Sequence, residues 1–161
     1  YTITAQCRNI TKANLPYLSD EYGLLSLDLD GMDYWIWDAL PLRPWLVVCE
    51  YNDLFGKKAV TIPYQESFNR TQFHHSNLYF GASLTAMCKL ATKKGYTFLG
   101  TNSNGCNAFF VRNDQAHRIH IKDAKAYPAK FREARNRDGK LTYANRAMQR
   151  ALIAHLPLEE V

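Results

Sequence analysis

Polar side chains that could perform acid–base chemistry follow three apolar runs of strand length in this sequence. They are Asp28, Asp30, Glu50, Asn52, Asn102 and Asn104. In open α/β sheets, ligands bind in the crevice outside the carboxyl ends of the strands. Neighbouring strands lie about 4.8 Å apart, so carboxylates at their ends come close together and the pKa of at least one rises. We therefore expect a base that works near neutral pH, or a site for a hydroxyl or cationic ligand.

A structural role is the alternative for each of these residues, because an acid after a strand often caps the following helix. Asp33 has the position of such an N-cap. For any single acid the structural role is the simpler interpretation. The group of Asp28, Asp30, Glu50 and Asn52 favours function, since carboxylates rarely interrupt apolar strand ends unless they are paired or used.

Two apolar runs, 24–29 and 45–51, predict buried parallel strands. The first run is leucine-rich and flanked by turn formers, which suits a strand buried on both faces, and the second is rich in Val and aromatic residues. About fifteen residues separate them, including two turns of helix that stop at Pro41. This length suits a helical crossover and exceeds what a hairpin needs.

Two further strands follow a helix predicted over 83–95. Apolar residues recur there at helical spacing, Ser83 suits the N-cap, and Gly95 suits the stop. A third parallel strand is predicted at 96–100, and a short connection predicts that 107–112 returns antiparallel. The fold class is therefore α/β, a partial Rossmann-like sheet with an antiparallel final strand and a helical C-terminal extension.

The long connection 53–82 carries two adjacent histidines, His74 and His75. Connections of this length usually cover a site, so we interpret it as a lid or substrate-facing insertion with at most one short strand. A metal centre that combines His74 with Asp30 and Glu50 is an alternative, because two His plus one acid is a familiar ligand set. Adjacent His side chains diverge on an extended chain, so we expect substrate contacts and no metal.

Composition places the chain among globular proteins. It has 161 residues, 47% hydrophobic residues and a net charge of +5, and no apolar run is long enough to span a bilayer. No leader pattern precedes the first strand and the four cysteines show no metal spacing, so reduced thiols and a cytoplasmic location are expected.

The positive charge is concentrated in residues 112–150. This region holds eleven of the 20 Lys and Arg and four of the 15 Asp and Glu. A solvated face is the simple interpretation, and an anionic ligand or partner is the alternative. Nucleic acid is not expected, because no recognition motif accompanies the basic residues.

A family resemblance rests on the stretch LLSLDLDGMDYWIW and on LVVCEYN, which follows it. Together they resemble the later half of FkbM-type S-adenosylmethionine-dependent methyltransferases. That family has an "IDIDG"-like strand end, a short helix, and a strand that closes in Glu plus a polar residue. The resemblance extends over about residues 10–114, through ASLTAMCKLATKKGY, TFLGTNSNG and NAFFVRND.

The resemblance implies roles for the strand-end residues. Asp28 and Asp30, with Gly31, would lie beside the methyl donor S-adenosylmethionine, and Glu50 would face the acceptor. The expected reaction moves a methyl group to a hydroxyl of a sugar or another polar metabolite, with Asp28, Asp30 and Glu50 as the catalytic candidates. The expected acceptor contacts are Asn52, His74, His75, Asn102 and Asn104.

The chain departs from the family in its first residues. Such enzymes hold the donor through a glycine-rich turn, and no GxGxxG precedes residue 24. We therefore expect 1–114 to be a C-terminal half-domain, followed by a basic extension over 115–161. It would be catalytic only with a missing N-terminal half or a partner polypeptide. The alternative is a non-catalytic interaction or scaffold module in a homo-oligomer or larger assembly, because half a sheet leaves edges and apolar faces uncovered.

Overall fold

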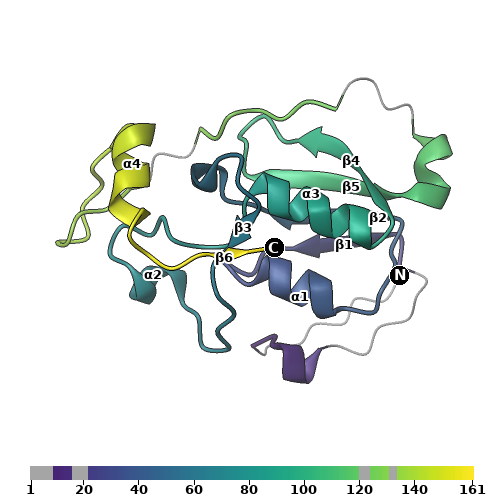
Figure 1. The fold of residues 1–161 in the computed structure, drawn as a ribbon, viewed down its shortest axis with the longest axis horizontal. Coiled ribbons are helices and arrows are strands. Elements are labelled where there is room, and N and C mark those ends of the chain that lie inside the picture. Colours follow the sequence, from purple (N-terminus) through teal and green to yellow (C-terminus); the bar gives the residue numbers. More distant parts are fainter. Residues whose placement is uncertain (1–8, 16–21, 120–123, 131–133) are drawn as a thin grey trace, which may run out of the picture.

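The computed structural model describes residues 9–15, 22–119, 124–130 and 134–161 (Figure 1). Its main sheet has four strands in the order β1 (Leu24–Leu27), β2 (Leu46–Glu50), β5 (Asn107–Arg112) and β4 (Tyr96–Thr101). β1 pairs parallel with β2, and β5 pairs antiparallel with both of its neighbours. The predicted α/β class and the parallel pairing of the first two strands are confirmed.

The position of the third predicted strand is corrected by the structure. β4 runs in the same direction as β1 and β2, but its only partner among the named strands is the antiparallel β5. The short connection 102–106 keeps β5 beside β4, and the other edge of β5 pairs with β2. β5 therefore separates the end of β4 from the ends of the two parallel strands.

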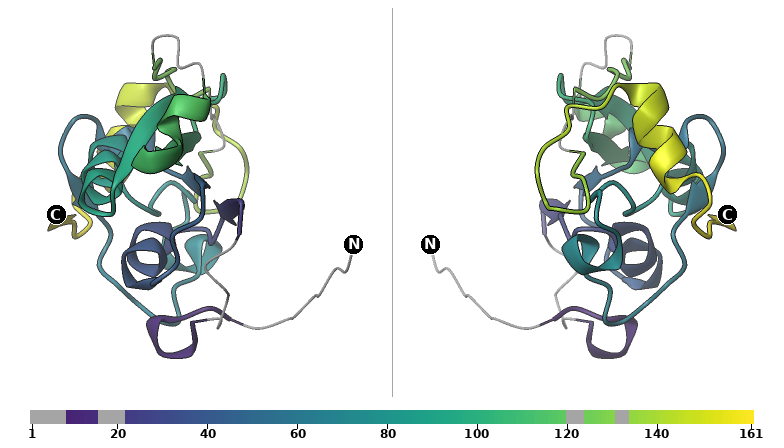
Figure 2. Two further views of the ribbon diagram at one scale, coloured as in Figure 1. Left: turned by 90° about the vertical axis from the view of Figure 1, so that its right-hand side faces the viewer. Right: turned by 90° about the vertical axis from the view of Figure 1, so that its left-hand side faces the viewer.

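Helices α1 (Asp33–Ala39) and α3 (Leu84–Lys93) lie on the same side of this sheet (Figures 1 and 2). The predicted helix start is confirmed, because the Ser83 hydroxyl accepts a hydrogen bond from the Ala86 amide at 3.0 Å. The core between helices and sheet contains Trp37, whose ring centroid lies 5.1 Å from that of Phe110. Both side chains are fully buried.

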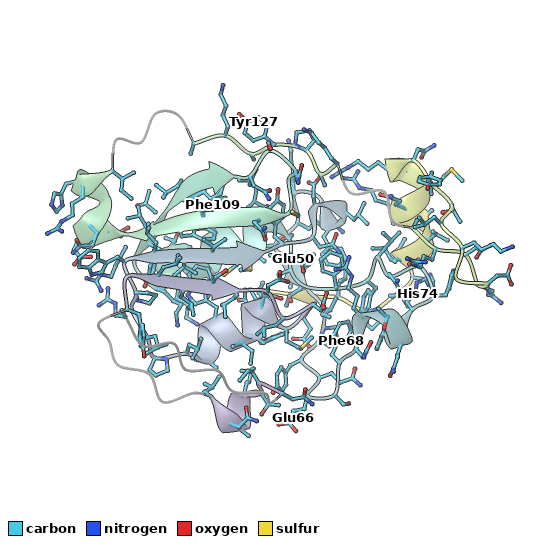
Figure 3. All side chains as sticks on the ribbon, turned by 180° about the vertical axis from the view of Figure 1, so that it is seen from behind. Glu50, Glu66, Phe68, His74, Phe109 and Tyr127 are labelled. Atoms are coloured by element: carbon cyan, nitrogen blue, oxygen red, sulfur yellow. The ribbon has the colours of Figure 1, made fainter. Side chains whose placement is uncertain are left out.

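The opposite face of the sheet is more open. In β2, Val47 and Cys49 are fully buried, whereas the alternate residues Leu46 and Val48 remain partly exposed. Phe109 pairs directly with Val48 and lies on this face, which is turned toward the viewer in Figure 3. β1 was expected to be buried on both faces, and this is wrong: Leu24 is 56% exposed, and β1 pairs on one side only within the described ranges.

The long connection is shaped by short elements: η2 (Asp53–Phe55), β3 (Val60–Thr61) and α2 (Arg70–Phe73). One short strand was predicted there and is confirmed, and α2 was not predicted. β3 pairs antiparallel with β6 (Glu159–Glu160), so the end of the chain returns to this connection.

The C-terminal extension packs against the sheet domain. η3 (Asn113–Arg118) leads into it, and its described part includes residues 124–130, which we call the strap, and α4 (Arg146–Ile153). The strap follows the β4–β5 hairpin, because the Thr101 amide donates to the Lys125 carbonyl at 2.9 Å and the Lys130 amide donates to the Asn104 carbonyl at 2.9 Å. Ala134 and Ile153 are buried in the common core.

Gly105 marks the closest approach of the strap to the hairpin. Its φ is +66°, and a Cβ built there would lie 2.5 Å from the carbonyl carbon of Pro128. Gly139 has a similar φ of +77° with open space around it. Gly105→Ala should therefore lower the free energy of unfolding by about 1–3 kcal/mol more than Gly139→Ala, since both incur the left-handed strain but only the first also overpacks. Urea unfolding of both variants measures this difference, and equal losses would show that the strap does not rest on the hairpin.

Candidate functional site

The predicted meeting of acidic residues at the carboxyl ends of neighbouring strands is confirmed for β1 and β2. The register places Leu27 opposite Cys49, so Asp28 and Asp30 leave β1 level with Glu50 at the end of β2. Glu50 shares its face of the sheet with Val48, and its side chain is 17% exposed. The Asp30 side chain is 73% exposed.

Arg70 joins the two strand ends, and the sequence analysis missed it. Its Nη1 lies 3.2 Å from Asp30 Oδ1 and 3.6 Å from Glu50 Oε1. Its Nε donates to the Asn77 carbonyl at 2.9 Å, and its guanidinium lies 3.7 Å from the centroid of the Phe80 ring. With these contacts the side chain is only 12% exposed. The local signal was Asn69, whose side-chain Oδ1 caps α2 by accepting from the amides of Thr71 and Gln72, but nothing in the sequence tells which way Arg70 points.

The surroundings of Glu50 shift its pKa. Burial raises its pKa from 4.5 to about 7; the Arg70 charge opposes this rise, and nearby Asp side chains add to it. Its Oε2 atom is buried and has no hydrogen-bond partner in the described part of the chain. The expectation that grouping raises the pKa of one acid is confirmed, although burial contributes more than the neighbouring carboxylates.

Asp33 has a different role from the predicted helix cap. Met32 occupies the N-cap position, and Asp33, a residue that is only 1% exposed, begins α1. The carboxylate accepts from the amides of Leu29 at 3.2 Å and Gly31 at 3.3 Å, and so closes the turn that follows β1. Burial raises its pKa to about 6, against the opposing effect of these backbone hydrogen bonds. Asp33 therefore holds the loop on which Asp30 is carried.

Gly31 was expected to contact a cofactor, and its surroundings leave little room for one. A Cβ built on Gly31 would lie 2.5 Å from Phe68 Cε1, so the Phe68 ring covers this glycine. The residue is buried, and its φ of +141° suits glycine. Gly31 allows the close packing of the connection against the β1 loop.

Asn52 was expected to contact the acceptor, but its amide is used inside the fold. Its Nδ2 donates to the carbonyls of Leu78 at 2.9 Å and Phe80 at 3.0 Å, and its Oδ1 accepts from the Leu54 amide at 3.0 Å. The residue is 2% exposed. Asn52 therefore holds the long connection against the end of β2.

A small cavity lies between Glu50 and α4. Its lining includes Glu50, Asp53, Phe80, Cys106, Arg146 and Gln149. Its volume of about 30 Å³ has room for one or two water molecules. Asp53 closes it, because its carboxylate accepts from the Ala129 amide of the strap at 3.0 Å and pairs with Arg146.

Asn102 and Asn104 lie apart from Asp28, Asp30 and Glu50, because β5 lies between β4 and β2. Asn102 Oδ1 accepts from the amides of Cys106 at 3.0 Å and Asn107 at 3.2 Å, which closes the β4–β5 hairpin. Asn104 is exposed, and its carbonyl contacts the strap. Both side chains were predicted as acceptor contacts, and the hydrogen bonds of Asn102 serve the hairpin instead.

His74 lies away from Glu50 and near α4 (Figure 3), and His75 lines a pocket together with Met148 and Leu152 of α4. His74 Nδ1 is 2.7 Å from the Ser76 hydroxyl, and its ring lies 4.3 Å from that of His75 and 6.1 Å from that of His155. Burial and these neighbours lower the pKa of His74. Within the described ranges no three His, Cys, Asp or Glu side chains are placed to hold a metal, so the alternative set of His74, Asp30 and Glu50 does not form.

Several arginines of the basic region make contacts within the chain. Arg112 pairs with Asp114, Arg135 donates to the Gly139 carbonyl at 2.7 Å, and Arg150 donates to the Leu54 carbonyl at 3.1 Å. These contacts link the basic region to itself and to the long connection. An anionic partner of the region stays a prediction.

No protein-family model, curated protein or solved structure matches this chain. Among the helices of the described segments, none has the length and apolar character that crossing a membrane requires.

The pKa of Glu50 makes the stability of the fold depend on pH. Its folded value of about 7 lies above the ordinary 4.5, so between these values the folded state binds more protons, and stability falls as pH rises through this window. Glu50→Gln removes this effect. The variant should equal the wild type near pH 4 and be more stable by about 1–3 kcal/mol near pH 8, as measured by urea unfolding.

Glu66→Gln is the matched control, because Glu66 is exposed and lies away from Glu50 in Figure 3. This control should change stability little at either pH. A Glu50→Gln variant that is less stable than the wild type near pH 8 would contradict the assigned burial cost.

Proposed function

We propose that this chain carries the acceptor side of an S-adenosylmethionine-dependent methyltransferase that acts on a hydroxyl of a sugar or another polar metabolite. The observation that carries the proposal is Glu50, whose buried Oε2 lacks a partner among the described residues and whose pKa is about 7. A general base works best when its pKa lies near the operating pH. The motif resemblance of 24–52 supplies the reaction class.

Glu50 performs the proton transfer in this proposal. The acceptor hydroxyl would donate a hydrogen bond to Glu50 Oε2 and give up its proton there as its oxygen takes the methyl group that bound S-adenosylmethionine would supply. S-adenosylmethionine supplies the electrophilic methyl group when it is bound. The rate gain comes from alignment of the two reactants and from proton acceptance by Glu50.

The residues after β1 fit the donor in part. Asp28 and Asp30 are exposed carboxylates beside Glu50, able to accept hydrogen bonds from hydroxyl or amino groups. Gly31 is covered by Phe68, so Asp28 and Asp30 would hold the donor together with residues that lie elsewhere. The remaining contacts are assigned to a glycine-rich half that this sequence does not contain.

Arg70 is the positioning residue of the site. It holds Glu50 Oε1 and Asp30 together and leaves Oε2 for the acceptor. Its positive charge also limits the rise in the pKa of Glu50 that burial causes. The cavity that Glu50 lines is about 30 Å³ and typical organic ligands need about 300–1,000 Å³, so acceptor binding at the buried Oε2 requires the residues around it to move apart.

A second candidate function is that of an interaction module, and the open face of the sheet favours it. Leu46, Val48 and Phe109 are partly exposed, and Leu24 of the edge strand is 56% exposed. Contiguous apolar side chains on an exposed surface are typical of interaction sites. An assembly partner could cover this face whether or not the acidic edge is catalytic.

The proposal is tested on this chain and on a version extended upstream by about 100 residues, enough for three βα units. Calorimetry should show S-adenosylmethionine binding only to the extended version. In that version, Glu50→Gln should lower kcat by about 10²–10⁴-fold, and the wild-type rate should rise with pH through about 7 as Glu50 ionises.

Glu66→Gln again provides the control and should keep full activity. Donor binding without any loss of activity in Glu50→Gln would remove Glu50 from the mechanism. An extended version that does not bind the donor would favour the interaction module.

A further inference from the structure

A lysine is held between two aromatic rings on the side of α1 that faces the N-terminal segment. The lysine is Lys12, the first residue of η1 (Lys12–Asn14), which lies against α1 (Figure 1). Its Nζ lies 4.3 Å from the centroid of the Trp35 ring and 4.5 Å from that of Tyr64. The two rings are 6.3 Å apart with an interplanar angle of 70°. They form two walls around one ammonium group.

The walls are held mainly by contacts that do not involve the Lys12 side chain. Trp35 belongs to α1, and its indole Nε1 donates to the Ile62 carbonyl at 2.8 Å. The Tyr34 ring packs edge-on against Trp35 at 5.2 Å. Tyr64 lies three residues after β3 and packs against the common core. The rings should therefore keep their arrangement when the lysine side chain is removed.

Lys12 itself lies at the surface of the domain. It is exposed, and η1 has no buried residue. Its backbone amide donates to the Tyr64 hydroxyl at 2.9 Å, and Ile10 and Leu15 pack partly against the core on either side of the turn. The backbone of η1 thus has its own contacts with the domain, so changing the Lys12 side chain opens the space between the rings without removing the turn.

We propose that Trp35 and Tyr64 form a binding site for small quaternary ammonium cations, and that Lys12 is an intramolecular competitor for it. Aromatic faces attract cations within about 6 Å, and sets of such faces recognise quaternary ammonium groups. The ammonium of Lys12 between the rings shows that the space accepts a cation. A tethered group has an effective concentration in the millimolar range, so it weakens the binding of a free cation without abolishing it.

The test uses the full chain and its Lys12→Gln variant, titrated with choline chloride. The readout is the indole N–H signal of Trp35 in a ¹H–¹⁵N NMR spectrum. Lys12→Gln should show a saturating shift of this signal. The wild type should need about tenfold more choline if Lys12 occupies the site nine-tenths of the time.

The chain contains its own controls. Trp45 is 45% exposed with Arg118 beside its ring at 5.3 Å, and its signal should not shift. Trp37 is fully buried, and an unchanged Trp37 signal shows that each variant is folded. The neutral isostere 3,3-dimethylbutan-1-ol has the shape of choline without its charge and should leave Trp35 unshifted.

Three results would overturn the proposal. The first is no Trp35 shift in Lys12→Gln at up to about 50 mM choline, where a site of millimolar affinity saturates. The second is an equal shift with the neutral isostere, which would indicate apolar contact alone. The third is unchanged binding after Tyr64→Leu is added to Lys12→Gln, because that change removes one wall.

Discussion

The arrangement of the acidic residues at the carboxyl ends of β1 and β2 depends on one contact, the bridge that Arg70 makes between Asp30 and Glu50. Glu50 ends a strand whose inward residues are fully buried, and its carboxylate would be costly there as an isolated charge. Arg70 reduces this cost and ties the long connection to the ends of β1 and β2. Asp33 and Asn52 also stabilise this region, because the side chain of each forms hydrogen bonds that hold a loop beside Glu50.

The regular elements were predictable from local patterns. The apolar runs located β1 and β2 to within two residues at each end, and the limits 107–112 of β5 agree with the structure. Ser83 and Gly95 bounded α3, because capping and a left-handed glycine act over a few residues. The meeting of Asp28 with Glu50 followed from the parallel pairing alone.

The parts that the sequence did not predict depend on contacts between distant segments. The insertion of β5 beside β2 follows from tertiary pairing, which the hairpin length does not specify. Asp33 resembled a cap in the sequence, but burial and two backbone donors direct it back toward β1. The strap is irregular, and α2, which begins at Arg70, is only four residues long, so no periodic pattern in the sequence indicates their direction. Asn102 likewise has turn chemistry that a list of strand-end polar residues does not reveal.

The central claim is that burial raises the pKa of Glu50 while Arg70 limits the rise, which leaves a base poised near neutral pH. The most direct measurement is an NMR titration of the Glu50 side-chain carboxyl carbon in the wild type and in Arg70→Gln. We expect a pKa of about 7 for Glu50 in the wild type and a higher value in the variant. A wild-type value at or below the ordinary 4.5, or a value that falls when Arg70 is replaced, would show that burial and Arg70 do not set the pKa of Glu50 in this way.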